Sequence, residues 1–207
     1  MAWYSADDLE VYLQASGLFS IPTASPSTLL DLAGAVTASQ EAFERDTLWF
    51  PFLKQNTDVT RYYDVVEGRL LDLQAGLLEL TSVTLAGQAL VEDSDFFLMP
   101  QNSDLRGLAF TYIEFSHCPN GGRKSIAITG RWGRVSTLPD EVKQAVLAKA
   151  ASLVAPQLHA LASQGLMRWR EGDVEQSSGT EPFDSLVRNW ERTFAECVRR
   201  YRRLAMA

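Results

Sequence analysis

The sequence predicts an α+β protein in which helices from both ends of the chain form a bundle, with an antiparallel β-sheet or small β-sandwich inserted between them. Apolar residues recur at helical spacing before residue 50 and after residue 138. From residue 57 to residue 132 the pattern changes to short β-branched or alternating runs separated by turn residues. We therefore divide the chain into N-terminal helices (1–54), a β-rich region (55–135) and C-terminal helices (136–207). The first and third segments are expected to form one helical body.

Composition excludes several classes of protein. The 207 residues are 46% hydrophobic and 22% charged, which is typical of a globular protein that buries a core without disulfides. Cys118 and Cys197 are far apart in the sequence, so they indicate neither a disulfide framework nor a CxxC metal or redox pair. The first residues are acidic where a signal peptide is cationic, and no apolar run reaches the roughly 20 residues of a membrane span. We expect a soluble protein of a reducing compartment.

The net charge of −7 is unevenly distributed along the chain. From Glu181 onward there are six arginines and four acids, so this end carries +2 and the rest of the chain carries −9. An acidic body repels DNA, and a short basic end favours contact with an acidic partner.

Two helices are expected at the N-terminal end. Ser5, followed three residues later by Asp8, is typical of an N-cap, and Gly17 lies where the first helix should end. Ser25–Pro26 supplies a cap and first turn for a second, alanine-rich helix that runs to about Trp49. Its small side chains favour close packing against other helices or other subunits.

Six runs in the central region are expected to be strands. They lie at residues 60–65, 68–73, 77–87, 96–100, 108–115 and 125–130. The breaks between them contain Gly, Pro, Asn or Asp, which supply turn conformations. Gly121–Gly122 is expected to form a hairpin turn, with Arg123 and Lys124 as solvated charges beside it.

Helical periodicity returns after Leu138. Pro139 fixes the first turn of a helix, and the acids that follow it complement the positive helix end. Pro156 should kink or end this helix, because it lacks a backbone N–H and clashes with the preceding turn. A last helix at about residues 181–204 opens near Thr180 and carries apolar residues spaced by three and four.

The sequence from Gly130 to Gly133, GRWG, is superficially similar to a phosphate-binding loop. A Walker loop needs a longer glycine-rich stretch followed by Lys and Ser or Thr, and a dinucleotide fingerprint needs three glycines. Neither spacing is present. We interpret Gly130, Trp132, Gly133 and Pro139 as a structural hinge, in which the glycines relieve steric clashes at a strand end and Trp132 packs. The alternative is a soluble nucleotide-binding protein that uses this hinge together with Arg123–Lys124.

No catalytic or metal-binding constellation is visible in the sequence. On a strand, the adjacent His117 and Cys118 would point to opposite faces, and His159 belongs to a helix. Asp93 and Asp95 lack the further ligands of an EF-hand loop. We therefore expect no enzyme activity, no cofactor and no metal ion.

The last helix is the candidate partner-binding surface. Its apolar stripe can lie in a groove of a partner, and its arginines can pair with the partner's acids. We expect it to be a docking element, so that removal of residues 180–207 leaves a folded body. A DNA-binding protein that uses the same arginines is a further alternative. The candidate residues are Trp190, Phe194, Arg199, Arg200, Tyr201, Arg202 and Arg203.

Six motifs occur in a fixed order: TRYYD (60–64), LLDL (70–73), LTSVTLAG (80–87), DFFLMPQN (95–102), AITGRWG (127–133) and LPDEVKQAVLAKAA (138–151). This ordered set resembles the phage head-tail connector proteins, the adaptors that dock beneath the portal of tailed phages. The resemblance extends from the second helix to Pro156. Two features depart from it: Arg134 stands where an aromatic or small residue is usual, and residues 165–207 go beyond the common core.

The resemblance implies a structural, non-enzymatic virion protein. About twelve copies would form a ring under the portal protein, extend the DNA channel, and offer a platform to the tail through a terminator, stopper or other neck protein. The protein would be located in the neck of the virion after assembly in the host cytoplasm, with no membrane involved. Double-stranded DNA would pass without specific binding, because a charge of about −84 on about twelve chains repels it. The last helix would anchor on the portal.

Overall fold

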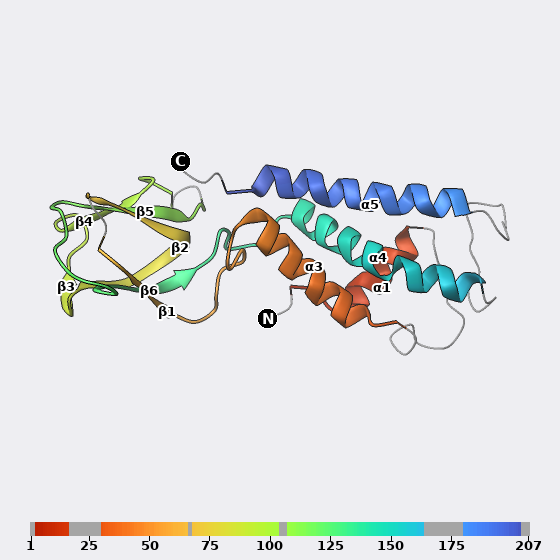
Figure 1. Ribbon diagram of the computed structural model, residues 1–207, viewed down its shortest axis with the longest axis horizontal. Helices are drawn as coiled ribbons and strands as arrows, with labels where there is room; N and C mark the ends of the chain where they lie inside the picture. The colour runs from red at the N-terminus through yellow and green to blue at the C-terminus, as the bar shows by residue number, and fades with distance from the viewer. Residues whose placement is uncertain (1–2, 17–29, 66–67, 104–106, 164–179, 204–207) are drawn as a thin grey trace. The chain divides into compact units, whose positions relative to one another are not determined.

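The computed structural model describes residues 3–16, 30–65, 68–103, 107–163 and 180–203. The chain divides into two compact units, Leu48–Leu138 and the combination of Met1–Thr47 with Pro139–Ala207. The first unit is a six-stranded antiparallel sheet, and the second is built from the helices that precede and follow it in the sequence. The predicted α+β class, with helices from the two ends of the chain and an antiparallel sheet between them, is confirmed (Figure 1).

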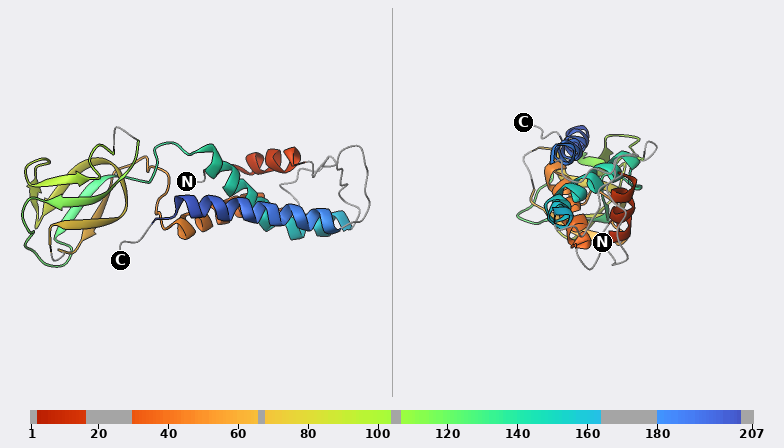
Figure 2. Two further views of the ribbon diagram at one scale, coloured as in Figure 1. Left: turned by 90° about the horizontal axis from the view of Figure 1, so that it is seen from above. Right: turned by 90° about the vertical axis from the view of Figure 1, so that its right-hand side faces the viewer.

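The helical unit is arranged around one central helix. The described residues form α1 (Ala6–Ala15), α3 (Leu32–Thr47), α4 (Asp140–Ser163) and α5 (Thr180–Tyr201). The other three helices all pack against α4 (Figures 1 and 2). Small side chains on several faces of α4 allow this close approach. Its buried residues are Val142, Ala145, Val146, Leu147, Ala148, Ala150, Ala151, Val154, Ala155 and Leu158.

The helix ends agree with the local sequence signals in one case and differ from them in two others. Ser5 and Asp8 form the predicted capping box, in which each side chain accepts the backbone N–H of the other residue. Helix α3 ends at Thr47, before the predicted end near Trp49, while Gly17 and Ser25–Pro26 lie outside the described residues. The prediction that Pro156 could end its helix is wrong, because α4 continues to Ser163. Burial of α4 between its neighbours outweighs the lost hydrogen bond.

The strand order in the sheet is β1-β6-β2-β5-β4, with β3 paired to β2. The strands are β1 (Val59–Tyr63), β2 (Leu70–Leu85), β3 (Gln88–Leu90), β4 (Phe96–Met99), β5 (Phe110–Phe115) and β6 (Ile126–Trp132). The long strand β2 pairs with β5 along its first half and with β6 along its second. Leu77 marks the change, since it is opposite both Phe110 and Trp132.

The structure corrects two predictions about this region. The runs predicted as separate strands at 68–73 and 77–87 belong to the single strand β2, because the break between them is a register shift rather than a turn. Gln74, with φ 55°, lies within this irregularity. Gly121–Gly122 is not a hairpin turn. Its segment joins β5 to β6, which lie on opposite sides of β2.

The β unit has a hydrophobic core made by its own strands. Alternating residues of β2, such as Leu71 and Leu73, point to one face, and the matching residues of β4, β5 and β6 join them. Bending at the irregularity of β2 lets the sheet surround this core. Its buried members are Leu71, Leu73, Ala75, Leu77, Val83, Phe96, Leu98, Ile113, Phe115, Ile126, Ile128 and Trp132.

Candidate protein-interaction surfaces

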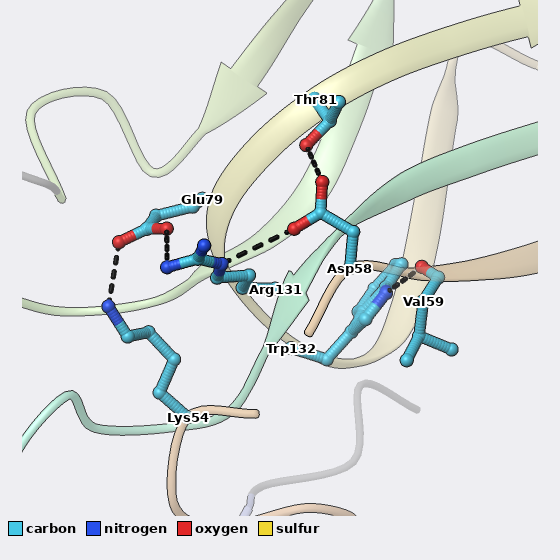
Figure 3. Close-up of polar contacts among 7 residues, drawn as sticks. All are labelled: Lys54, Asp58, Val59, Glu79, Thr81, Arg131 and Trp132. Carbon is cyan, nitrogen blue, oxygen red and sulfur yellow. Dashed lines mark hydrogen bonds and ion pairs between the residues drawn. The ribbon is translucent and has the colours of Figure 1, made fainter. Parts of the chain in front are cut away.

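Trp132 joins β6 to β1 inside the β unit. Its side chain is fully buried, and its indole N–H donates to the carbonyl of Val59 at 2.7 Å (Figure 3). The guanidinium of Arg61 lies 4.5 Å from the centre of the indole ring, and the ring of Tyr63 is 6.4 Å away. A buried indole with a satisfied N–H and a cation over its face is a packing anchor.

Gly130 lies inside β6 and not at its end, so the strand continues past it to Trp132. It is paired with Val59 on one side and with Leu80 on the other. A Cβ atom at this position would lie 2.3 Å from the carbonyl oxygen of Glu79. The glycine therefore allows β2 and β6 to approach closely where β2 is irregular.

The backbone that follows is occupied by contacts within the unit. The N–H of Gly133 donates to the carbonyl of Gly76 at 2.8 Å, and those of Arg134 and Val135 both donate to the carbonyl of Phe52. A Cβ on Gly133 would lie 2.6 Å from backbone atoms of Lys54. A phosphate-binding loop offers free N–H groups to the anion. These three groups are already used, which counts against the nucleotide-binding alternative.

Pro139, the last residue of the predicted hinge, stands immediately before α4. Its carbonyl accepts the N–H groups of Val142 and Lys143, at 3.0 Å and 3.1 Å. The bond from Lys143 is the first regular hydrogen bond of α4, and the bond from Val142 satisfies one of the N–H groups that a helix otherwise leaves unpaired at its start. The boundary between the two compact units also falls at this proline.

A chain of charged side chains covers the outer surface where β1, β6 and β2 meet (Figure 3). Lys54 binds Glu79 at 2.7 Å, Glu79 binds Arg131 at 3.2 Å, and Arg131 binds Asp58 at 3.3 Å. The hydroxyl of Thr81 donates to Asp58 at 2.6 Å. That hydrogen bond, followed by Arg131, holds the pKa of Asp58 below its usual value, and the hydrogen bond from Lys54 does the same for Glu79. Both carboxylates are ionised at neutral pH, and the four charges cancel.

Sequence reasoning did not find this network. Its members come from three separate segments, and Arg131 and Glu79 become neighbours through the shifted register of β2 and β6. Charge alternation along one strand gives no indication of such a pairing.

The apolar stripe of α5 lies inside the helical unit. The side chains of Trp190 and Phe194 are buried, and the ring of Phe194 meets that of Phe43 edge-on at 6.1 Å. The ring of Tyr201 is 6.5 Å from the same phenylalanine. Trp190 and Phe194, which were predicted to contact a partner, are therefore part of the core of the helical unit.

Glu141, near the start of α4, holds the end of α5. Its carboxylate forms an ion pair with Arg200 and accepts the hydroxyl of Tyr201. Burial, followed by this hydrogen bond, raises the pKa of Tyr201 to about 12. Burial also raises the pKa of Cys197 to about 11, and its thiol points to the backbone carbonyl of Glu141 at 3.7 Å. Cys197 is therefore a protonated core thiol at neutral pH and a poor nucleophile.

The remaining candidate arginines differ in their surroundings. The backbone N–H of Arg203 donates to the carbonyl of Thr47 at 2.9 Å, and its side chain is half-buried. The side chains of Arg199 and Arg202 are exposed. Of the seven residues predicted at this surface, these two are exposed arginines without an ion pair to a described carboxylate.

The described residues contain no group of three or more His, Cys, Asp or Glu side chains that could hold a metal ion. Within the same residues, no helix is long and apolar enough to cross a membrane. His117 and Cys118 lie in the segment after β5 and not on a strand, and both are exposed.

No protein-family model matches the chain, and no curated protein matches it. Among solved structures, the chain is similar to a chain of a structure described as the neck of an empty GTA particle computed with C6 symmetry. The alignment covers 99% of this chain and 91% of the other, with a TM-score of 0.51 and 14% sequence identity. This likeness shows that the two chains share a fold along nearly their whole length.

Proposed function

We propose that the protein is a structural subunit of the neck of a tailed phage or phage-like particle, a head-tail connector that forms a ring under the portal. The observation that carries this proposal is the fold shared with the GTA neck chain over 99% of the residues. The ordered motifs from TRYYD to the start of α4 point to the same class of protein.

The chemistry of the described residues supports a structural role. The backbone N–H groups at 133–135 are used within the β unit, and the charges of the network around Arg131 cancel. Cys197 is buried as a thiol beside Glu141. Each of these features stabilises the fold, and none of them offers a reactive group to a substrate.

A ring of about twelve copies fits this proposal. The neck structure with the shared fold was computed with C6 symmetry, and a ring of about twelve subunits can obey six-fold symmetry. Because each chain carries −7, such a ring repels DNA and lets it slide through the channel without being held. One face of the ring would meet the portal, and the other would meet a tail terminator, stopper or other neck protein.

We place the portal contact at the C-terminal end of the described chain. Trp190 and Phe194 are buried, and Arg200 and Tyr201 bind Glu141, so these four are not available to a partner without rearrangement. Arg202 is exposed and follows the last residue of α5. An arginine at this position can pair with acidic groups on the portal.

The test is genetic removal of the protein from a particle-producing strain. We expect DNA-filled heads and separate tails that do not join, and restoration of joined particles by the wild-type chain. Arg202→Lys should restore joining, whereas Arg202→Glu should restore it poorly, although both variants fold. Normal, fully tailed particles without the protein would contradict the proposed function. Full activity of Arg202→Glu would contradict the portal contact alone.

A further inference from the structure

The outward face of α5 carries a stripe of arginines. Arg188, Arg192 and Arg199, with Ala195 between the last two, recur at spacings of four, three and four. In a helix such residues lie on one face, here the face opposite the buried apolar stripe. All four are exposed, and the stripe is about 16 Å long. Exposed cations are therefore concentrated along one side of one helix.

These arginines are not neutralised within the described chain. Arg188 donates to the backbone carbonyl of Asp184 at 3.2 Å, and Arg192 donates to the side-chain amide of Asn189 at 2.8 Å. Neither these two nor Arg199 forms an ion pair with any described carboxylate. The arginine stripe therefore has the charge and the free hydrogen-bond donors to bind an acidic surface.

Helix α1 presents a surface of the opposite sign. It contains three acids and neither lysine nor arginine. Asp8 caps the helix with Ser5, while Asp7 and Glu10 form no ion pair with any described residue. Val11, one turn after Asp7, is 64% exposed. The outer face of α1 thus carries an exposed apolar side chain with one acid a turn before it and a second acid beside it.

The two surfaces lie on different sides of the helical unit. Helices α1 and α5 both pack against α4, and they do so on different sides of it (Figures 1 and 2). One copy therefore does not bring its own two surfaces together, whereas two copies arranged head-to-tail do. Repetition of one such heterologous contact generates a ring when the rotation closes.

We propose that the arginine stripe of α5 in one copy binds the outer face of α1 in the next copy. This inference rests on the ring proposed above and assigns the contact between its subunits. Val11 packs against the small side chain of Ala195, and Asp7 and Glu10 pair with the arginines on either side. The contact has an apolar centre with charged pairs around it, as protein interfaces commonly do.

Surface chemistry favours a second copy over nucleic acid as the occupant. The outer face of α1 offers an exposed valine to Ala195 as well as acids to the arginines, whereas a phosphate backbone offers charge alone. The contact should weaken at high salt, because the Debye length falls from about 10 Å at 0.1 M to about 3 Å at 1 M.

A charge-swap experiment on the full chain tests the contact. One variant carries Arg192→Glu and Arg199→Glu, and the other carries Asp7→Lys and Glu10→Lys. Sedimentation at low salt should show self-association of the wild type, and at least about tenfold weaker self-association of either variant alone. An equimolar mixture of the two should associate like the wild type, because every contact between unlike copies is then attractive. Arg123→Glu with Lys124→Glu matches the charge change of the first variant, lies in the β unit, and should leave association unchanged.

Disulfide cross-linking is a second test, which detects the contact even if it is weak in solution. In a Cys118→Ser background, Val11→Cys combined with Ala195→Cys should form a ladder of disulfide-linked copies under mild oxidation, in purified protein or in assembled necks. Either single variant should stop at a linked pair. Unchanged association of the charge variants, failure of the mixture to restore association, or absence of the ladder would overturn the inference.

The outcomes separate this inference from the proposed function. Duplex DNA binding that is lost with Arg192→Glu and Arg199→Glu, and is not restored by mixing, would assign the stripe to nucleic acid and refute the contact. If the protein is found in necks and neither charge-reversal variant changes their assembly, the contact is refuted and the neck role is not. Protein absent from necks, with restoration on mixing, would support the contact and refute the neck role.

Discussion

Replacing Gly130 by alanine should destabilise the β unit strongly. The new Cβ would lie 2.3 Å from the carbonyl oxygen of Glu79 and 2.9 Å from a methyl group of Leu77. The first of these is a backbone atom of a paired strand, and the second belongs to a fully buried side chain, so neither can move without cost. Overpacking of this kind costs about 3 kcal/mol, against a gain of about 0.5 kcal/mol from the stiffer unfolded chain. We expect a net loss of roughly 2.5 kcal/mol.

Gly122→Ala is the matched control, because a Cβ there meets nothing within 4 Å. Its free energy of unfolding should change by less than about 1 kcal/mol. The assay is urea unfolding followed by hydrogen-exchange mass spectrometry, which reports the peptide containing β6 separately from the helical unit. If Gly130→Ala were within about 0.5 kcal/mol of the wild type, the close approach of β2 and β6 would be refuted.

Three further predictions concern titratable groups. A thiol reagent at neutral pH should modify the exposed Cys118 quickly and Cys197 slowly in the folded chain, because burial raises the pKa of Cys197 to about 11; equal rates would contradict its placement. Glu141→Gln should lower the pKa of Tyr201, about 12 in the wild type, as measured by ultraviolet titration; an unchanged value would contradict the contact. The pKa of Asp58 is lowered by folding, so its stabilisation is present above the unfolded pKa and is lost as pH falls through the folded pKa. Asp58→Asn should therefore flatten the acid side of the stability curve, and an identical pH dependence would be evidence against the network.

The parts of the fold that depend on residues close together in the sequence could be predicted from it. The capping box of Ser5 and Asp8 needs residues three apart, and the apolar face of α5 needs one helical period. Strand pairing depends on residues far apart in the sequence. The runs on either side of Gly76 were predicted as two strands, because nothing local shows that β5 and β6 pair with one continuous strand before and after it.

The partner-binding surface predicted on α5 could not be assigned from the sequence for a similar reason. Periodicity predicts that Trp190 and Phe194 share a face, but it does not say whether that face packs against the same chain or against another. The structure places both side chains in the helical unit beside α4. Removal of residues 180–207 would expose buried residues of α4 to water, so we now expect that deletion to destabilise the helical unit as well as to remove the docking element. Substitutions at exposed arginines are the appropriate test of docking.

The central claim is that this chain is a neck subunit, and cryo-electron microscopy of the particle tests it most directly. A map of the head-tail junction should show a ring below the portal into which the helical unit and the β unit can be fitted, each as described here. The copies should be related by rotation around the DNA channel. A well-resolved neck with no density for this fold, in particles shown by mass spectrometry to lack the protein, would contradict it.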